Sequence, residues 1–329
     1  MYKWIWVTWE KQERNVGLSQ AFGMPLFVFD LPYGGFRRHL VAVVRTLRTF
    51  AEQRPGLVVV QNPSLVLAAM ALQYGKLFKV PIVVDAHNAG LFPEAFVCGG
   101  GAKIKLLKSL ARYVVRNAAL TIVTNFRLKD YVEQNGGKAE VIPDCIPRLA
   151  EKKNQLQLSG RVNVMCVCSY DADEPYLEVI EATRKLDSSV CVYMTGDWKN
   201  ARIMPNSLPS NLVLTGFLSR ADYLDLLWAC DIVMDLTTLE DCLVCGAYEG
   251  VAAGKPLILS DSKANRAYFK KGVAYAHNTA EDLAQKTVES IRALDRSRRE
   301  ISELRVELET GWEERRKAVA DVFAELHRH

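Results

Sequence analysis

The chain has 329 residues, of which 49% are hydrophobic and 24% are charged, and its formal net charge is +4. This length exceeds what one typical hydrophobic core requires, so two domains are expected. The composition fits a soluble globular protein, and the mild positive charge suits anionic ligands, so no nucleic-acid partner is expected.

No uninterrupted apolar run in the sequence is long enough to span a bilayer. The first ten residues are too short and too aromatic for a signal peptide and are expected to form a first strand. Eight cysteines without secretory signals indicate a reducing, cytoplasmic location with mostly buried thiols. Cys242 and Cys245 have no second pair at zinc spacing, so no metal site is expected.

The first half of the chain alternates apolar runs with helical patterns, which predicts an α/β domain with a parallel, doubly wound sheet over residues 1–147. Strands are expected at residues 4–8, 26–29, 57–60, 82–84, 120–124 and 140–142. Helices are expected at residues 17–22, 37–52, 104–117 and 126–133, with one more ending at residue 77. Ligand-binding side chains should gather at the carboxyl ends of these strands. The candidates there are Arg14, Asn15, Gly17, Gln61, Asn62, Asp85, His87 and Asn88.

Residues 148–160 are polar and unpatterned, so an interdomain linker is expected there. A second alternating series predicts another parallel-sheet domain over residues 161–311. Its strands are expected at residues 162–168, 189–195, 212–216, 232–235, 257–259 and 273–275, and its helices at residues 176–186, 220–229 and 282–294. The charged tail is helical with an apolar stripe, and residues 312–329 are expected to cross back to the first domain.

The most informative stretch covers residues 241–261, where an acidic loop precedes a helix and a buried strand. The small side chains of Cys245, Gly246 and Ala247 open the helix and would let a ligand approach the backbone. The N–H groups and positive dipole end of the helix suit a diphosphate, and Glu249 lies one turn further on. The pattern fits a sugar-nucleotide site; the alternative is a Rossmann-like helix–strand step in which Glu249 is only solvated.

This stretch resembles the nucleotide-sugar site of GT-B glycosyltransferases, especially family 4, whose pattern has two glutamates separated by seven residues and then Gly-x-Pro. Glu249, Gly254 and Pro256 fit the pattern, whereas Asp241 stands in place of the first glutamate. The resemblance implies that Glu249 binds the ribose hydroxyls and that Asp241 orients the donor sugar. It also implies the GT-B architecture, in which two Rossmann-like domains face a central cleft, the first binding the acceptor and the second the nucleotide sugar.

One departure concerns the diphosphate. Family 4 enzymes usually place an arginine, and five residues later a lysine, after the first strand of the second domain, where this chain has Ser169 and Glu174. An acidic loop with a serine is similar to the chitobiose mannosyltransferase type. The replacement cations expected near the donor are Lys263, Arg266 and Arg14, together with the helix amides of residues 245–247.

The strand ends of the first domain also resemble that type. His87 is expected to touch the donor sugar or flank the acceptor; the alternative is a structural hydrogen-bonding role. Gly17, in the loop expected after the first strand, is placed with Asn62 and Asn88 on the acceptor side.

The resemblance implies transfer of a hexose from a nucleoside diphosphate sugar to a hydroxyl of a saccharide or lipid-linked saccharide, in polysaccharide or glycan assembly, without a metal or other cofactor. Family 4 implies retention of configuration, which is preferred. The chitobiose-type features imply inversion with Asp85 or His87 as the base. The remaining alternatives are a noncatalytic nucleotide-sugar-binding scaffold and an epimerase of GT-B form.

A basic amphipathic helix carries Lys103, Lys105 and Lys108 between apolar residues. Such a helix can rest on anionic lipid, so peripheral contact with the cytoplasmic face of a membrane is a further expectation.

Overall fold

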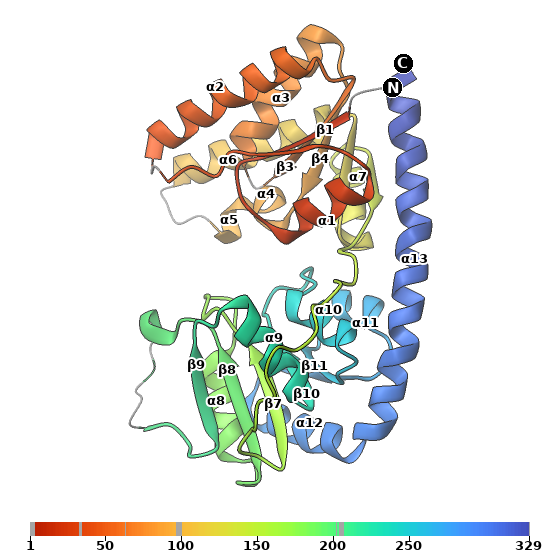
Figure 1. The fold of residues 1–329 in the computed structure, drawn as a ribbon. Helices are drawn as coiled ribbons and strands as arrows, with labels where there is room; N and C mark the ends of the chain where they lie inside the picture. Colours follow the sequence, from red (N-terminus) through yellow and green to blue (C-terminus); the bar gives the residue numbers. More distant parts are fainter. Residues whose placement is uncertain are drawn as a thin grey trace. The chain divides into compact units, whose positions relative to one another are not determined.

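The computed structural model describes residues 4–32, 35–62, 64–96, 101–201, 203 and 207–328. The chain divides into two compact units, of which unit 1 comprises Met1–Cys145 with Gly311–His329, and unit 2 comprises Ile146–Thr310. Each unit contains one wholly parallel six-stranded sheet with helices packed on both faces (Figure 1). The predicted α/β class with two doubly wound parallel sheets is therefore confirmed.

The elements of unit 1 are β1 (Trp4–Thr8), α1 (Glu13–Ala21), β2 (Leu26–Val28), α2 (Gly35–Gln53), β3 (Leu57–Asn62), α3 (Leu65–Phe78), β4 (Ile82–Ala86), α4 (Asn88–Leu91), α5 (Pro93–Phe96), α6 (Gly101–Asn117), β5 (Leu120–Val123), α7 (Phe126–Gln134) and β6 (Ala139–Val141). The strand order is β2-β1-β3-β4-β5-β6. All six residues of β3 are buried, as expected for a strand covered on both faces. One face packs against α2, α3 and α6, and the other packs against α1 and the end of the last helix.

The elements of unit 2 are β7 (Val162–Val167), α8 (Tyr176–Arg184), β8 (Val190–Thr195), the 3₁₀ helix η1 (Trp198–Asn200), β9 (Leu212–Gly216), α9 (Arg220–Ala229), β10 (Ile232–Asp235), α10 (Cys245–Ala252), β11 (Leu257–Ser260), α11 (Lys263–Tyr268), β12 (Val273–Ala276) and α12 (Ala280–Arg292). The strand order is β12-β11-β10-β7-β8-β9. This order places the topological switch point between β7 and β10, where ligands of open α/β sheets bind.

Local sequence explains where many helices begin. Hydroxyl or amide side chains accept a hydrogen bond from the backbone of the first turn, which satisfies a donor that has no partner inside the helix. These N-caps are Ser64 of α3, Asn125 of α7, Ser219 of α9, Ser262 of α11 and Thr279 of α12.

Two local expectations differ from the structure. Helix α1 begins at Glu13, so Arg14 and Gly17 lie on a helix and not in a glycine-bearing loop. Residues 148–160 contain no helix or strand, but the segment packs on unit 2, because the backbone N–H groups of Lys153 and Asn154 donate to the carboxylate of Asp225. It therefore belongs to unit 2.

The last helix, α13 (Leu294–Arg328), contributes to both units. In unit 1, the ring N–H of Trp312 donates to the carbonyl of Pro143 at 2.9 Å. Further along, the fully buried ring of Phe323 lies 6.1 Å from Trp4 and 5.0 Å from Phe22, centroid to centroid. The end of α13 is therefore part of the unit 1 core.

We expect Phe323→Ala to lower the free energy of unfolding by about 3–5 kcal/mol, because it leaves a cavity between the sheet and α13. The control is Val306→Ala, which truncates an exposed side chain of the same helix and should change stability by less than about 0.5 kcal/mol. Urea denaturation followed by tryptophan fluorescence measures both. Equal midpoints for the two variants would contradict the packing of α13 in the core.

Candidate functional site

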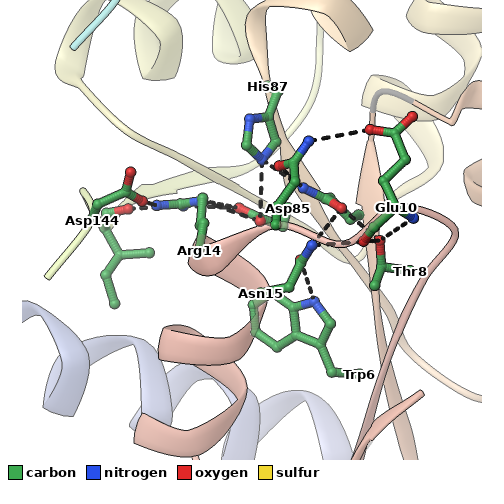
Figure 2. A network of polar contacts seen from close by, with 11 residues as sticks. Trp6, Thr8, Glu10, Arg14, Asn15, Asp85, His87 and Asp144 are labelled. Carbon is green, nitrogen blue, oxygen red and sulfur yellow. Dashed lines mark hydrogen bonds and ion pairs between the residues drawn. The ribbon is translucent and has the colours of Figure 1, made fainter. Parts of the chain in front are cut away.

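A buried polar network lies at the carboxyl ends of β1, β3 and β4 in unit 1 (Figure 2). Arg14 of α1 contacts Asp85 at the end of β4, with 2.8 Å from Nη2 to Oδ1 and 3.2 Å from Nε to Oδ2. Its Nη1 lies 2.5 Å from a carboxylate oxygen of Asp144, and Nη2 also donates to the carbonyl of Ile142. The side chain of Arg14 is 4% exposed and that of Asp85 is fully buried.

Both members of this pair stay charged. Burial alone would lower the pKa of Arg14, but the two carboxylates outweigh it and raise that pKa. Burial alone would raise the pKa of Asp85, but the charge and hydrogen bonds of Arg14 outweigh it and lower that pKa to about 2. A buried ion pair is stable only when its remaining hydrogen-bonding groups are satisfied, and all three guanidinium nitrogens donate here.

His87 follows β4 and is only partly buried. Its Nε2 lies 3.0 Å from Nε2 of Gln61 and 3.7 Å from Oδ2 of Asp85. The side-chain oxygen of Gln61 accepts from Thr8 and Asn15, so its amide nitrogen is the group that donates to His87. The neutral imidazole then carries its proton on Nδ1, which faces away from the network in Figure 2. His87 can therefore offer a hydrogen-bond donor to a ligand hydroxyl.

This geometry corrects three predicted roles in unit 1. Arg14 has its donors engaged in a buried ion pair and is not available to bind a phosphate. Asp85 is fully buried with a depressed pKa, so it is a poor base and acts instead by positioning Arg14. Gly17 lies inside α1, and a Cβ built on it would lie 3.4 Å from the sulfur of Cys145. Gly17 therefore does not line a ligand loop.

The two asparagines expected on the acceptor side flank His87. Asn62 ends β3 and is 1% exposed, and its Oδ1 has no hydrogen-bond partner among the described residues. Asn88 opens the short helix α4. A Cβ on Gly90 would come within 2.1 Å of Asn62 Oδ1, so the Asn62 amide packs directly against the backbone of α4.

In unit 2, Glu249 of α10 is held between two side chains of α9. Its Oε1 lies 2.6 Å from Nη1 of Arg220, and its Oε2 accepts from the hydroxyl of Tyr223. The guanidinium of Arg220 also lies 5.5 Å from the centre of the Tyr223 ring. Burial and the neighbouring carboxylate raise the pKa of Tyr223, so it remains a hydrogen-bond donor. A carboxylate oxygen accepts more than one hydrogen bond, so Glu249 can still receive ligand hydroxyls.

The N-terminal amides of α10 are less available than the sequence suggests. The N–H of Gly246 donates at 2.7 Å to Oδ2 of Asp235, the last residue of β10. The N–H of Ala247 donates to the carbonyl of Val244 at 3.3 Å, which leaves Cys245 as the exposed residue of the three. Burial and the nearby acids raise the pKa of Asp235 well above its ordinary value. The predicted diphosphate contact through the amides of Gly246 and Ala247 is therefore not supported.

The loop after β7 carries an internal anion. The N–H groups of Ser169 and Asp171 donate to Oε2 of Glu174, at 2.8 Å and 3.0 Å, and the Ser169 hydroxyl donates to Oε1. The thiol of Cys168 adds a further contact at 3.3 Å. Successive backbone N–H groups form such anion-binding concavities, and in this structure the chain's own carboxylate occupies this one. The donor-side role predicted for Ser169 thus requires Glu174 to move.

The two cations predicted after β11 lie at the surface of α11. Arg266 pairs with Asp261, with 2.8 Å from Nη2 to Oδ2, and its guanidinium lies 4.4 Å from the centre of the Tyr275 ring. Lys263 opens the helix and donates its backbone N–H toward Glu240. A pocket of about 120 Å³ lies beside them at the ends of β10, β11 and β12. It is lined by Thr237, Thr238, Leu239, Glu240, Ser260, Asp261, Ser262, Ala276, His277 and Asn278. Asp241 lies in the same β10–α10 loop and is half-buried.

Sequence reasoning missed Arg220, Tyr223 and Asp235. No spacing links α9 to Glu249, because the contact spans 29 residues and depends on the packing of two helices. Asp235 did carry a signal, since an acid at the end of a buried strand lies at the ligand-binding edge of the sheet.

Within the described parts of the chain, no cluster of three His, Cys, Asp or Glu side chains could hold a metal ion. No helix of the described residues has the length and apolar character to cross a membrane.

Two wholly parallel, doubly wound sheets in one chain are the architecture of the GT-B fold, and solved structures with this fold are similar over nearly the whole chain. Sucrose-phosphate synthase from Thermosynechococcus elongatus has a TM-score of 0.77 at 14% identity, covering 98% of this chain and 99% of that one. HepE from Anabaena, in complex with UDP and glucose, has a TM-score of 0.70 at 16% identity, covering 97% and 91%. A glycosyltransferase from Rickettsia africae has a TM-score of 0.70 at 12% identity, covering 99% and 98%.

Residues 7–144 match the family model described as a glycosyl transferase 4-like domain. Comparison with the curated proteins gives no significant sequence match. The predicted resemblance to GT-B, family 4-like glycosyltransferases is confirmed, and the fold and the domain together support a glycosyltransferase enzyme.

We expect the Arg14–Asp85 pair to make the free energy of unfolding depend on pH in the acidic range. The folded-state pKa of Asp85 is about 2 against an ordinary value of 3.8, so its ionised form stabilises the fold above pH 4 by about 2 kcal/mol. That contribution is lost as the pH falls from about 4 to 2. Arg14→Met removes it and leaves a buried carboxylate without its cation, at a cost of about 3–5 kcal/mol at neutral pH.

The matched control is Arg48→Met, because Arg48 forms an ion pair with Glu52 but is 79% exposed, and such pairs contribute less than about 1 kcal/mol. Urea denaturation at several pH values measures the free energy of unfolding of the wild type, Arg14→Met and Arg48→Met. If Arg14→Met were as stable as Arg48→Met, the buried pair would not anchor unit 1.

Proposed function

We propose that this protein transfers a hexose from a nucleoside diphosphate sugar to a hydroxyl of a saccharide or lipid-linked saccharide, in cell-surface polysaccharide or glycan assembly. The observation that carries the proposal is the Glu249 carboxylate, held by Arg220 and Tyr223 beside the switch point of the unit 2 sheet. Two fixed oxygens suit the two neighbouring hydroxyls of a ribose. HepE, of the same fold, is in complex with UDP-glucose in one structure, which supports a nucleotide sugar as the donor class.

The leaving group of this reaction is a nucleoside diphosphate, so stabilising its developing charge is the main catalytic task. The proposal assigns that task to exposed cations of unit 2, namely Lys263 and Arg266, with Arg220 beside the ribose. Asp241 orients the donor sugar. No metal or other cofactor takes part in this proposal.

Retention of configuration is the proposed outcome, with the departing phosphate helping to remove the acceptor proton. Inversion needs a general base on the opposite side of the sugar. Asp85 is buried and ionised in its pair with Arg14, and Nε2 of His87 accepts from Gln61. Neither group supports a base in unit 1, and the Nδ1 proton of His87 favours hydrogen bonding to a sugar hydroxyl instead.

A nucleotide-binding panel tests the donor site. Isothermal calorimetry with UDP, GDP, ADP and their sugars should give selective binding of one nucleotide. Glu249→Ala should weaken that binding about 10- to 100-fold, because it removes charged hydrogen bonds. The control Glu181→Ala removes an exposed acid of α8 and should change nothing. Replacing the nucleotide by its 2′-deoxy form should weaken binding to the wild type but not to Glu249→Ala.

A wild type that binds no nucleotide would sink the glycosyltransferase proposal. Binding without transfer or donor hydrolysis would instead indicate a nucleotide-sugar-binding scaffold. This is the main alternative, because Glu174 and Asp241 stand where the family pattern has other residues.

Product stereochemistry tests the mechanism. We expect NMR of the product to show the anomeric configuration of the donor. His87→Gln should lower kcat/KM about 10-fold through loss of one hydrogen bond, with the product anomer unchanged. The control is His39→Gln, because His39 is exposed on α2 and contacts none of the network residues shown in Figure 2. An inverted product would overturn the retaining mechanism and restore His87 as a candidate base.

The proposed lipid-linked acceptor implies peripheral contact with an anionic membrane at its cytoplasmic face. The sequence pointed to α6 for this contact. In α6, Leu106 is 68% exposed, but Lys108 pairs with Glu94 at 2.7 Å.

A further inference from the structure

Helix α2 exposes a second apolar face. Leu40, Val44 and Leu47 are 53%, 58% and 44% exposed, and their spacing of four and three residues puts them on one stripe of the helix. The opposite side of α2 is used for packing, since Ala42 and Phe50 are fully buried in the unit 1 core. The exposed stripe is therefore not needed to hold α2 on the sheet.

Two arginines lie beside this stripe. Arg37 precedes Leu40 by three residues and Arg48 follows Val44 by four, so both neighbour the stripe, and Arg45 lies between them in the sequence. Glu52 is the one acidic residue of the helix, and it accepts a hydrogen bond from Arg48.

The end of α3, which lies beside α2, also exposes apolar side chains. Leu77 is 76% exposed and Phe78 is 59% exposed, and Lys76 and Lys79 flank them in the sequence. The ring of Phe78 lies 4.6 Å from that of Tyr74, which lies 4.6 Å from that of Phe50 in α2. This chain of rings places the exposed end of α3 beside α2, as Figure 1 also shows for the two helices.

The charge of this part of the chain is one-sided. Between residues 31 and 84 there are seven lysines and arginines and one acid, a net charge of 7 − 1 = +6, which exceeds the +4 of the whole chain. The cations are Arg37, Arg38, Arg45, Arg48, Arg54, Lys76 and Lys79, and the acid is Glu52.

We propose that the α2–α3 face, defined as Leu40, Val44, Leu47, Leu77 and Phe78 with the cations beside them, docks unit 1 on an anionic lipid surface. A helix that lies in the membrane interface places its apolar stripe at the acyl boundary and its arginines among the lipid phosphates. The side chains of the α2–α3 face supply both. This inference rests on the membrane contact proposed above and moves it from α6 to α2 and α3.

Sedimentation with vesicles tests the face. The wild type should pellet with vesicles of equal parts phosphatidylcholine and phosphatidylglycerol, and much less with phosphatidylcholine alone. The triple variant Leu40→Gln, Val44→Gln, Leu47→Gln should lower partitioning at least about 10-fold. The triple variant Arg37→Gln, Arg45→Gln, Arg48→Gln should lower it roughly 100-fold, at about 5-fold for each arginine. Arg→Lys at the same three positions should keep most of the binding.

The matched control is Lys103→Gln, Lys105→Gln, Lys108→Gln, which removes three charges from α6 and should change partitioning by less than about 3-fold. An equal loss in this variant would overturn the α2–α3 face and return the contact to α6. A wild type that stays in solution with both kinds of vesicle would also overturn it.

Failure of this inference is separable from failure of the donor site. Calorimetry with UDP in the absence of vesicles should give the same affinity for the α2 variants as for the wild type. A wild type that binds UDP but no vesicles overturns the docking face alone. One that binds vesicles but no nucleoside diphosphate overturns the donor site alone.

Discussion

The buried pair between Arg14 and Asp85 is the interaction on which the polar edge of unit 1 depends. It ties α1 to the end of β4, and through Asp144 and the carbonyl of Ile142 it ties both to the segment after β6. Leaving either charge unpaired in the interior would cost several kcal/mol, so the three segments are constrained together. His87 is held at the same edge by the side-chain amide of Gln61, which donates to its Nε2.

In unit 2, by contrast, several carboxylates gather at one edge of the sheet. Glu249 is neutralised by Arg220 and hydrogen-bonded by Tyr223, whereas Glu174 is held by loop amides. Burial and the neighbouring acids raise the pKa of Asp235, whose Oδ2 accepts from the N–H of Gly246. The diphosphate of the proposed donor would meet this edge with like charge. Its binding would require cations that turn toward it, and Glu174 would have to give up its hydrogen bonds to the loop amides before those amides could serve a ligand.

The sequence predicts the strands well because both sheets are parallel and buried on both faces, so each strand reads as a continuous apolar run between turn residues. All of the described strands lie at expected positions, within one or two residues. The beginning of α1 was missed because Glu13, Arg14 and Asn15 read as a polar loop, although Arg14 and Asn15 are buried. A charged residue that is buried through a partner 71 residues away has no local signature.

The sequence motif of the candidate site could be predicted, but the residues that contact the motif in the folded chain could not. The helix, the glutamate and the following strand of the donor motif depend on local sequence, and α10 and β11 form where the pattern places them. Which amides remain available is a tertiary question, because Asp235 reaches Gly246 only once β10 and α10 are packed. The same holds for Lys263 and Arg266, whose exposure follows from the packing of α11 and not from their spacing.

The position of Glu249 is finally set by the first turn of α9 and not by the donor motif alone. Ser219 caps that turn by accepting from the N–H of Asp222, which fixes the backbone that carries Arg220 and Tyr223. These two residues are three positions apart and so lie on one face of the helix, where each holds one oxygen of the carboxylate. The proposed ribose contact would therefore depend on two helices, and changes at the start of α9 would alter it while the donor motif stays unchanged.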